Sequence, residues 1–209
     1  MTARFAPFFL RGALAASLSF GACADFERED FGDTTGIEEI AMPLTALATP
    51  CDVAPISGVM TMTVVLGDGE TGIISKRSID SALLVNGYAC GTATTTNVKR
   101  IAVNGSSGTN TLVLDFLNGT FVPGYGSGAG TPGIVIDLVS GSNDAVKIRG
   151  SSNADTITIG ADGIAFNADT VKDATIANVD ELVFSLGAGA DIFSGSGGYG
   201  TGAAHTGVL

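Results

Sequence analysis

Histidine and tryptophan are almost missing from this chain, which has one histidine, His205, and no tryptophan. Neither a histidine-paired nucleophile nor a zinc site of several histidines can be assembled from these residues. The G-x-S-x-G, H-E-x-x-H and P-loop strings do not occur. With three tyrosines and no tryptophan, the aromatic platforms on which sugars stack are scarce. These absences point away from common enzyme classes, and we expect a protein that is not an enzyme.

Basic residues are few as well. The chain has 10 Lys and Arg against 21 Asp and Glu, a formal net charge of −11 at pH 7. Because nucleic-acid binding needs clustered positive charge, we expect no nucleic-acid partner. Only 15% of the residues are charged, so the carboxylates lie sparsely among glycines and threonines. Such a pattern suits either solubility or the binding of hard cations.

The apolar run near the N-terminus is too short to span a bilayer. It reads GALAASLSFGA, residues 12–22, and Arg4 and Arg11 supply positive charge before it. Positive charge, a short apolar run and small residues at its end are typical of a secretory signal peptide. We therefore predict a signal peptide over residues 1–22 and an exported protein.

Two cleavage sites are compatible with this signal. Gly21 and Ala22 before Cys23 match a lipoprotein signal, in which a lipid on Cys23 anchors the chain to the membrane. Ala22-Cys23-Ala24 is also an ordinary A-x-A site, which would release a soluble protein. The sequence thus predicts either a cell-envelope lipoprotein or a secreted extracellular protein.

The segment that follows the signal, residues 23–50, is rich in acidic residues. It shows no sustained apolar period and predicts a flexible tether.

Two cysteines remain once Cys23 is lipidated or removed. Two thiols in an exported chain suggest a disulfide between Cys51 and Cys90, and two buried, unpaired cysteines are the alternative.

The rest of the chain predicts an all-β fold. Short runs rich in Val, Ile, Thr and Leu, broken by Asn-Gly and other glycine turns, predict a small β-sandwich or meander over residues 51–118. Residues 119–133 are rich in glycine and proline and predict a loop. Over residues 134–209 the strands are shorter and recur more closely, with Gly, Asn and Asp between them. This rhythm predicts a parallel β-solenoid that ends in a glycine-rich tail.

Two nonapeptides in the predicted solenoid carry a recognisable motif. LGAGADIFS (186–194) has glycine at 187 and 189, aspartate at 191 and phenylalanine at 193. GSSNADTIT (150–158) has glycine at 150, aspartate at 155 and isoleucine at 157. Both resemble the haemolysin-type calcium-binding (RTX-like) repeat, G-G-x-G-x-D-x-U-x, where U is a large apolar residue. In the second segment Asn153 stands at a glycine position, and asparagine is the residue that best tolerates a left-handed backbone after glycine.

The resemblance implies a parallel β-roll with calcium held between successive turns by carboxylates and backbone carbonyls. It implies a ligand set of Asp191, Gly187, Gly189, Asp155, Asn153 and Asp144. The pattern is only partly met: residues 195–203 have Gly200 where the aspartate belongs, and Asp144 lies eleven residues before Asp155 rather than nine. We therefore expect degenerate or truncated repeats.

Other motifs predict less. Residues 128–133 and 195–200 match G-x-G-x-x-G but open no helical segment, so nucleotide binding is not expected. A carboxylate groove formed by Asp115, Asp137, Asp144 and Asp180 would suit a carbohydrate-active β-helix enzyme, although scattered turn aspartates are the simpler interpretation.

The leading hypothesis is an exported, non-enzymatic calcium-binding or surface structural protein. A metal-free, adhesin-like binding module is the alternative.

Overall fold

The computed structural model describes residues 51–126 and 130–206, and all regular structure in these ranges is β-strand. The predicted signal peptide, the lipidation site Cys23 and the acidic tether lie outside the described residues. No helix long and apolar enough to cross a membrane occurs in the described ranges.

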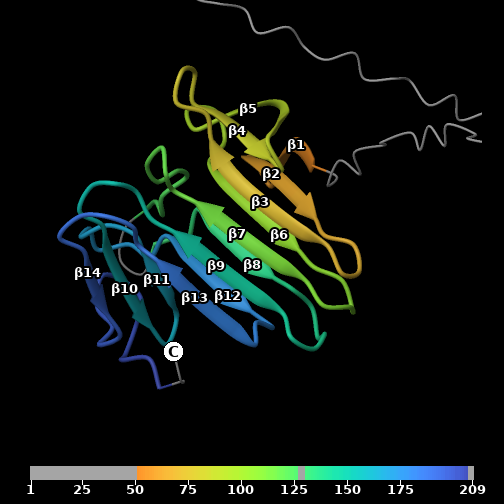
Figure 1. Cartoon of the computed structure of the whole chain (residues 1–209). Helices are drawn as coiled ribbons and strands as arrows, with labels where there is room; N and C mark the ends of the chain where they lie inside the picture. Colours follow the sequence, from red (N-terminus) through yellow and green to blue (C-terminus); the bar gives the residue numbers. More distant parts are fainter. Residues whose placement is uncertain (1–50, 127–129, 207–209) are drawn as a thin grey trace, which may run out of the picture. The chain divides into compact units, whose positions relative to one another are not determined.

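The strands belong to two sheets (Figure 1). The first has 8 strands in the order β1-β2-β6-β8-β12-β11-β10-β14, and the second has 6 in the order β13-β9-β7-β3-β4-β5. In chain order the strands are β1 Cys51–Ile56, β2 Val59–Val65, β3 Thr71–Lys76, β4 Ala82–Val85, β5 Tyr88–Thr94, β6 Arg100–Asn104, β7 Thr111–Asp115, β8 Ile134–Asp137, β9 Ala145–Arg149, β10 Thr156–Gly160, β11 Gly163–Ala165, β12 Ala174–Ala177, β13 Glu181–Ser185 and β14 Ile192–Ser194.

Four strand pairs form the stacked coils of a β-solenoid: β2–β3, β6–β7, β8–β9 and β12–β13. The first strands of these pairs are hydrogen-bonded in parallel, in the order β2-β6-β8-β12. The second strands are likewise parallel, in the order β3-β7-β9-β13. The chain thus alternates between the two sheets and advances by one strand in each sheet per coil. The prediction of an all-β fold with a parallel solenoid is confirmed.

The parallel coils begin at Val59, earlier in the chain than the sequence pattern indicates. The region expected to be a sandwich or meander, residues 51–118, contributes the first two coils. Its antiparallel part consists of β1, beside β2, and the β4–β5 hairpin, beside β3. The hairpin turns at Asn86 and Gly87, which have φ values of 50° and 84°. The Asn-Gly turn signal was therefore right locally, whereas the pairing of β2 with β6 joins segments distant in sequence.

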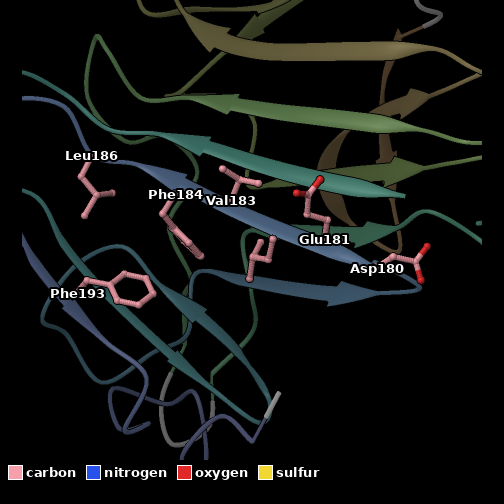
Figure 2. A pocket seen from close by; sticks show the side chains of 7 residues that line it. Asp180, Glu181, Val183, Phe184, Leu186 and Phe193 are labelled. Atoms are coloured by element: carbon pink, nitrogen blue, oxygen red, sulfur yellow. The ribbon is translucent and has the colours of Figure 1, made fainter. Parts of the chain in front are cut away.

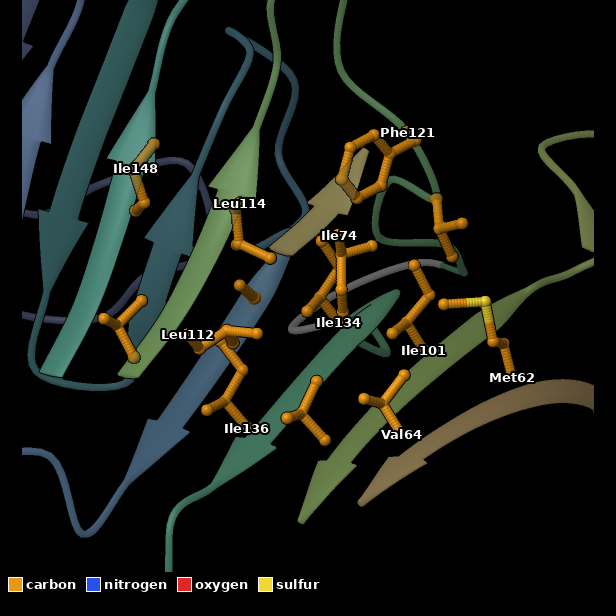
Figure 3. Close-up of a cluster of buried hydrophobic side chains, with 14 of the residues drawn as sticks. Met62, Val64, Ile74, Ile101, Leu112, Leu114, Phe121, Ile134, Ile136 and Ile148 are labelled. Atoms are coloured by element: carbon orange, nitrogen blue, oxygen red, sulfur yellow. The ribbon is translucent and has the colours of Figure 1, made fainter. Parts of the chain in front are cut away.

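The core consists of apolar rows that run along the solenoid between the sheets (Figure 3). In the first sheet Met62, Ile101, Ile134 and Ala174 occupy one register position on successive coils. In the second sheet Ile74, Leu114, Ile148 and Phe184 do the same. Each fully buried Leu or Ile contributes roughly 1.5–3 kcal/mol. Phe121, from the glycine-rich loop 119–126, is also buried and packs edge-on against Phe116 with ring centroids 4.9 Å apart.

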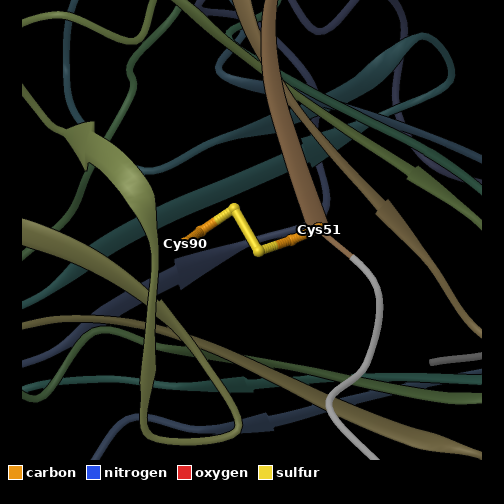
Figure 4. Close-up of a disulfide and its surroundings, with 2 residues drawn as sticks. All are labelled: Cys51 and Cys90. Carbon is orange, nitrogen blue, oxygen red and sulfur yellow. A yellow bond between two sulfur atoms is a disulfide. The ribbon is translucent and has the colours of Figure 1, made fainter.

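A disulfide closes the N-terminal end of the solenoid (Figure 4). Cys51 opens β1 and Cys90 lies in β5, with Cα atoms 5.8 Å apart. The bond joins the antiparallel strands that cover the first coil in the two sheets. The predicted disulfide is confirmed. Closing a loop of 39 residues stabilises the fold by about 3–4 kcal/mol in the loop-entropy account.

The C-terminal part adds strands to the first sheet only. After β9 the chain forms the β10–β11 hairpin, in which β11 pairs antiparallel with β12, and β14 later pairs in parallel with β10. The glycine-rich tail folds back over this hairpin: the Asp162 N–H donates to Thr201 O, and Ala204 forms a bridge with Gly160. The second sheet ends at β13.

Candidate functional site

Polar side chains at one corner of the solenoid connect each coil with the next. This corner lies just before the strands of the second sheet, where Asn110, Asp144 and Asp180 precede β7, β9 and β13. Asp144 Oδ1 accepts a hydrogen bond from the Asn110 N–H at 2.7 Å. Asp180 Oδ2 accepts one from the Asp144 N–H at 2.9 Å. We call these three residues the corner ladder.

The corner ladder repeats at the length of a coil. Its members are separated by 34 and 36 residues, and Asn110 and Asp144 are 0% and 1% exposed. A buried N–H without an acceptor costs about 1–3 kcal/mol. The side chains of Asp144 and Asp180 therefore each stabilise the preceding coil. Asp144 acts here as a structural acceptor between coils.

The two RTX-like nonapeptides stack on each other at a different corner. Strands β10 and β14 pair with Thr156 beside Ile192 and Ile157 beside Phe193, which places equivalent motif positions side by side. Asp191 Oδ1 accepts the Asp155 N–H at 3.0 Å across a separation of 36 residues. Asp155 Oδ2 in turn accepts the Ser151 N–H at 2.8 Å within its own turn.

Gly187 and Gly189 allow this close stacking. Their φ values are 89° and 143°, and a Cβ on either would lie 2.5 Å from the carbonyl oxygen of Ser151 or Asn153. Asn153, in contrast, does not have the left-handed backbone that the sequence suggested, since its φ is not positive. Its turn is closed instead by Ser151, whose Oγ accepts the Asn153 N–H at 3.0 Å.

The expected ligands are thus brought together in part. Asp155, Asn153, Gly187, Gly189 and Asp191 share the nonapeptide corner, whereas Asp144 lies at the other end of β9. The donors at this corner are all oxygens, the kind that calcium prefers. However, Asp155 and Asp191 already accept backbone N–H groups, so calcium would have to share them. Within residues 51–126 and 130–206 no group of three or more His, Cys, Asp or Glu side chains is arranged to hold a metal.

Each of the four carboxylates considered for carbohydrate chemistry is engaged in an ion pair or a hydrogen bond. Asp115 forms an exposed ion pair with Arg149 at 3.2 Å. Asp137 accepts hydrogen bonds from Asn178 Nδ2 and the Val139 N–H, and these lower the pKa of its carboxyl. Asp144 and Asp180 belong to the corner ladder. His205 lines a separate hollow of about 270 Å³ together with Asp162 and Asn178.

An apolar groove of about 610 Å³ lies beside β13, at the C-terminal end of the second sheet (Figure 2). Leu182, Phe184 and Leu186 line it from β13 and the residue after it, and Phe193 faces them from β14. The rings of Phe184 and Phe193 have centroids 4.9 Å apart. Asp180 and Glu181 mark the end of the groove where β13 begins.

Comparison of the chain with protein-family models, with curated proteins and with solved structures finds no match.

Sequence reasoning missed three features. The groove was missed because no local signal marks ELVFS (181–185) as the last strand of its sheet. The corner ladder carried a weak signal, namely an Asn or Asp directly before a strand at intervals of one coil. The third is Asp173, a buried aspartate that connects the loop 119–126 to the segment between β11 and β12. Its Oδ1 accepts the Gly124 N–H at 2.8 Å and its Oδ2 accepts the Phe166 N–H at 2.6 Å.

Replacing Asp144 tests the corner ladder. We expect Asp144→Ala to lower the free energy of unfolding by about 1–3 kcal/mol, because the buried Asn110 N–H loses its acceptor. The exposed Asp52 on β1 provides the matched control, and Asp52→Ala should change stability by no more than about 0.5 kcal/mol. Urea unfolding followed by circular dichroism measures both. Equal losses in the two variants would contradict the structural role of Asp144.

Asp173 should give stability a pH dependence of defined sign. Burial raises the pKa of its carboxyl above the ordinary 3.8, against the opposing effect of the two N–H bonds. The folded state therefore holds the proton more tightly than the unfolded state. Asp173 then makes the unfolding free energy fall as pH rises from 3.8 to the raised pKa. A carboxyl-carbon NMR titration should place the midpoint above 3.8, and a midpoint at or below that value would contradict the assignment.

Proposed function

We propose that this chain is an exported, non-enzymatic surface structural protein whose β-solenoid serves as a rigid scaffold. The corner ladder is the observation that carries the proposal. Its carboxylates accept hydrogen bonds from the backbone of the preceding coil, which is a structural task. The engagement of Asp115 with Arg149, and of Asp137 with Asn178 and the Val139 N–H, supports the same conclusion, because general acid–base chemistry on a sugar needs two carboxylates facing one substrate.

Two observations support export. Residues 1–22 have the composition of a secretory signal, with a short apolar run after positive charge. The disulfide between Cys51 and Cys90 is of a kind that persists in oxidising compartments and is rare in the cytosol. A solenoid held together by parallel coils and a disulfide suits a protein that must remain folded outside the cell.

Fractionation of cells that express the full chain tests export and anchoring together. We expect the wild-type protein in the membrane fraction, without reactive thiols at positions 51 and 90. Cys23→Ser should move it into the soluble exported fraction, because the lipid acceptor is gone. Cys51→Ser is the control and should leave the membrane association unchanged. A cytoplasmic protein with both thiols free would overturn the proposal, whereas a wild-type protein already soluble and starting at Asp25 would favour the A-x-A cleavage site.

Calcium binding, as the RTX-like resemblance implies, is a second candidate function. The parallel register of β10 and β14 favours it, because equivalent positions of the two nonapeptides lie on adjacent coils. Asp191 Oδ1 accepts a hydrogen bond from the Asp155 N–H. The carbonyl oxygen of Ser151 lies against Gly187, and that of Asn153 lies against Gly189. These groups supply oxygen donors from both coils to one corner.

Calorimetric titration with calcium tests this second candidate. We expect weak binding, with a dissociation constant of about 10⁻⁴ to 10⁻³ M, as in extracellular modules. Asp191→Ala should abolish the heat and remove any calcium-dependent protection of residues 150–194 from proteolysis. Asp180→Ala is the matched control, because it removes a similar N–H acceptor at the other corner. If the wild type shows neither heat nor added protection, the nonapeptides serve as turns only.

A further inference from the structure

Strand β13 has a free edge. Among the described strands only β9 pairs with it, in parallel. The Glu181 N–H donates to Asp144 O and the Gly150 N–H donates to Ser185 O, so the backbone groups at both ends of β13 face β9. Because these groups alternate in direction along a strand, the N–H and C=O of Leu182 and Phe184 point away from β9. Unpaired groups of this kind are a template for another strand.

The opposite end of the solenoid is built differently. There β1 covers the edge of the first sheet and contains the exposed Pro55, which has no N–H to donate. The disulfide fixes β1 to β5, the edge strand of the second sheet. Edge prolines are a common device against strand addition. Strand addition at β1 is therefore disfavoured, so β1 of another copy is a poor partner for the free edge of β13.

The side chains beside the free edge are apolar. Leu182, Phe184 and Leu186 line the groove of about 610 Å³, and Phe193 is 42% exposed across from them (Figure 2). The equivalents of Leu182 and Phe184 one strand back, Val146 and Ile148, are 0% and 1% exposed. The last coil thus presents core positions that one further strand would cover.

We propose that β13 pairs antiparallel with β13 of a second copy of this chain, around a two-fold axis at Val183. In this register Leu182 of one copy lies opposite Phe184 of the other, so the apolar inner positions meet. Glu181 lies opposite Ser185, and the two Val183 residues face each other. A two-fold interface of this kind closes on itself and ends assembly at the dimer.

Charge complementarity selects this antiparallel register. A parallel pairing would place Glu181 beside its own equivalent, and like charges directly opposite each other destabilise strand pairs. In the antiparallel register Glu181 approaches the row that contains Arg149 and Asp115, because Ser185 pairs with Arg149 and Arg149 with Asp115 on the same face. Arg149 is 53% exposed and already binds Asp115. Glu181 of the second copy thus brings a negative charge to this row, and the positive Arg149 attracts it.

The inference is independent of the proposed function, since it depends only on the edge, the groove and the charges beside β13. The net charge of −11 on each copy opposes association. Physiological salt screens such repulsion beyond about 8 Å, and the interface itself carries few like-charge contacts. The dimer should therefore form more readily in about 0.15 M salt than at low ionic strength.

Sedimentation analysis of the full chain carrying Cys23→Ser tests the dimer, because this parent protein cannot be lipidated. We expect a concentration-dependent monomer–dimer equilibrium. Val183→Lys should raise the dissociation constant by about tenfold or more, because two lysines then face each other across the axis. Ile73→Lys is the matched control: Ile73 lies on β3, in the same outward row as Val183, is 39% exposed, and should leave dimerisation unchanged.

Cross-linking tests the register. The two residues 183 would form a pair without backbone hydrogen bonds, with Cα atoms about 4.5 Å apart, which is within the range that a disulfide spans. In the Cys23→Ser parent, Val183→Cys should give a covalent dimer on mild oxidation. Ile73→Cys in the same parent should give no covalent dimer.

Three outcomes would overturn the proposal. The first is a protein that stays monomeric at all concentrations. The second is equal cross-linking through positions 73 and 183. The third is protection of the Leu182 and Phe184 amides from hydrogen exchange in a strict monomer, which would mean that another part of the same chain fills the edge. Protection of these two amides that rises with protein concentration supports the second copy as the occupant.

Discussion

The hydrogen bond from a backbone N–H of one coil to a carboxylate of the next is the interaction on which this structure depends. At the corner ladder Asp144 and Asp180 each accept such a bond, and Asp191 does the same at the nonapeptide corner. These bonds fix the register of β7, β9 and β13 and that of β10 and β14. Fixed register then keeps the apolar rows of the two sheets aligned, because a slip by one residue would turn each inward side chain outward.

The two ends of the solenoid differ, and the difference follows from the same stacking rule. Each coil leaves its outer backbone groups for the next coil to satisfy, so both ends of a solenoid need cover. At the N-terminal end β1, the β4–β5 hairpin and the disulfide provide it. At the other end the added strands extend the first sheet only. The second sheet stops at β13, where Leu182 and Phe184 are half-buried.

Local chemistry was readable from the sequence, whereas long-range pairing was not. The turn at Asn86 and Gly87, the pairing of Cys51 with Cys90 and the all-β class all follow from residue types at short range or from elimination. The two nonapeptides were aligned by motif, and their strands do stack in that alignment. The partnership of β2 with β6 was not predictable, because the hairpin between them lengthens the coil and hides the period. The free edge of β13 was equally hidden, since edge and central strands of a solenoid look alike in sequence.

The central claim is that the coils within residues 51–118 and those within residues 134–194 form one continuous solenoid with a shared core. Methyl NMR on the full chain tests it most directly, because Ile101 lies between Met62 and Ile134 in a single buried row. The account predicts nuclear Overhauser contacts from the Ile101 methyl groups to both of these neighbours. Contacts from Ile101 confined to residues 51–118 would show a separate N-terminal domain and would contradict the continuous solenoid.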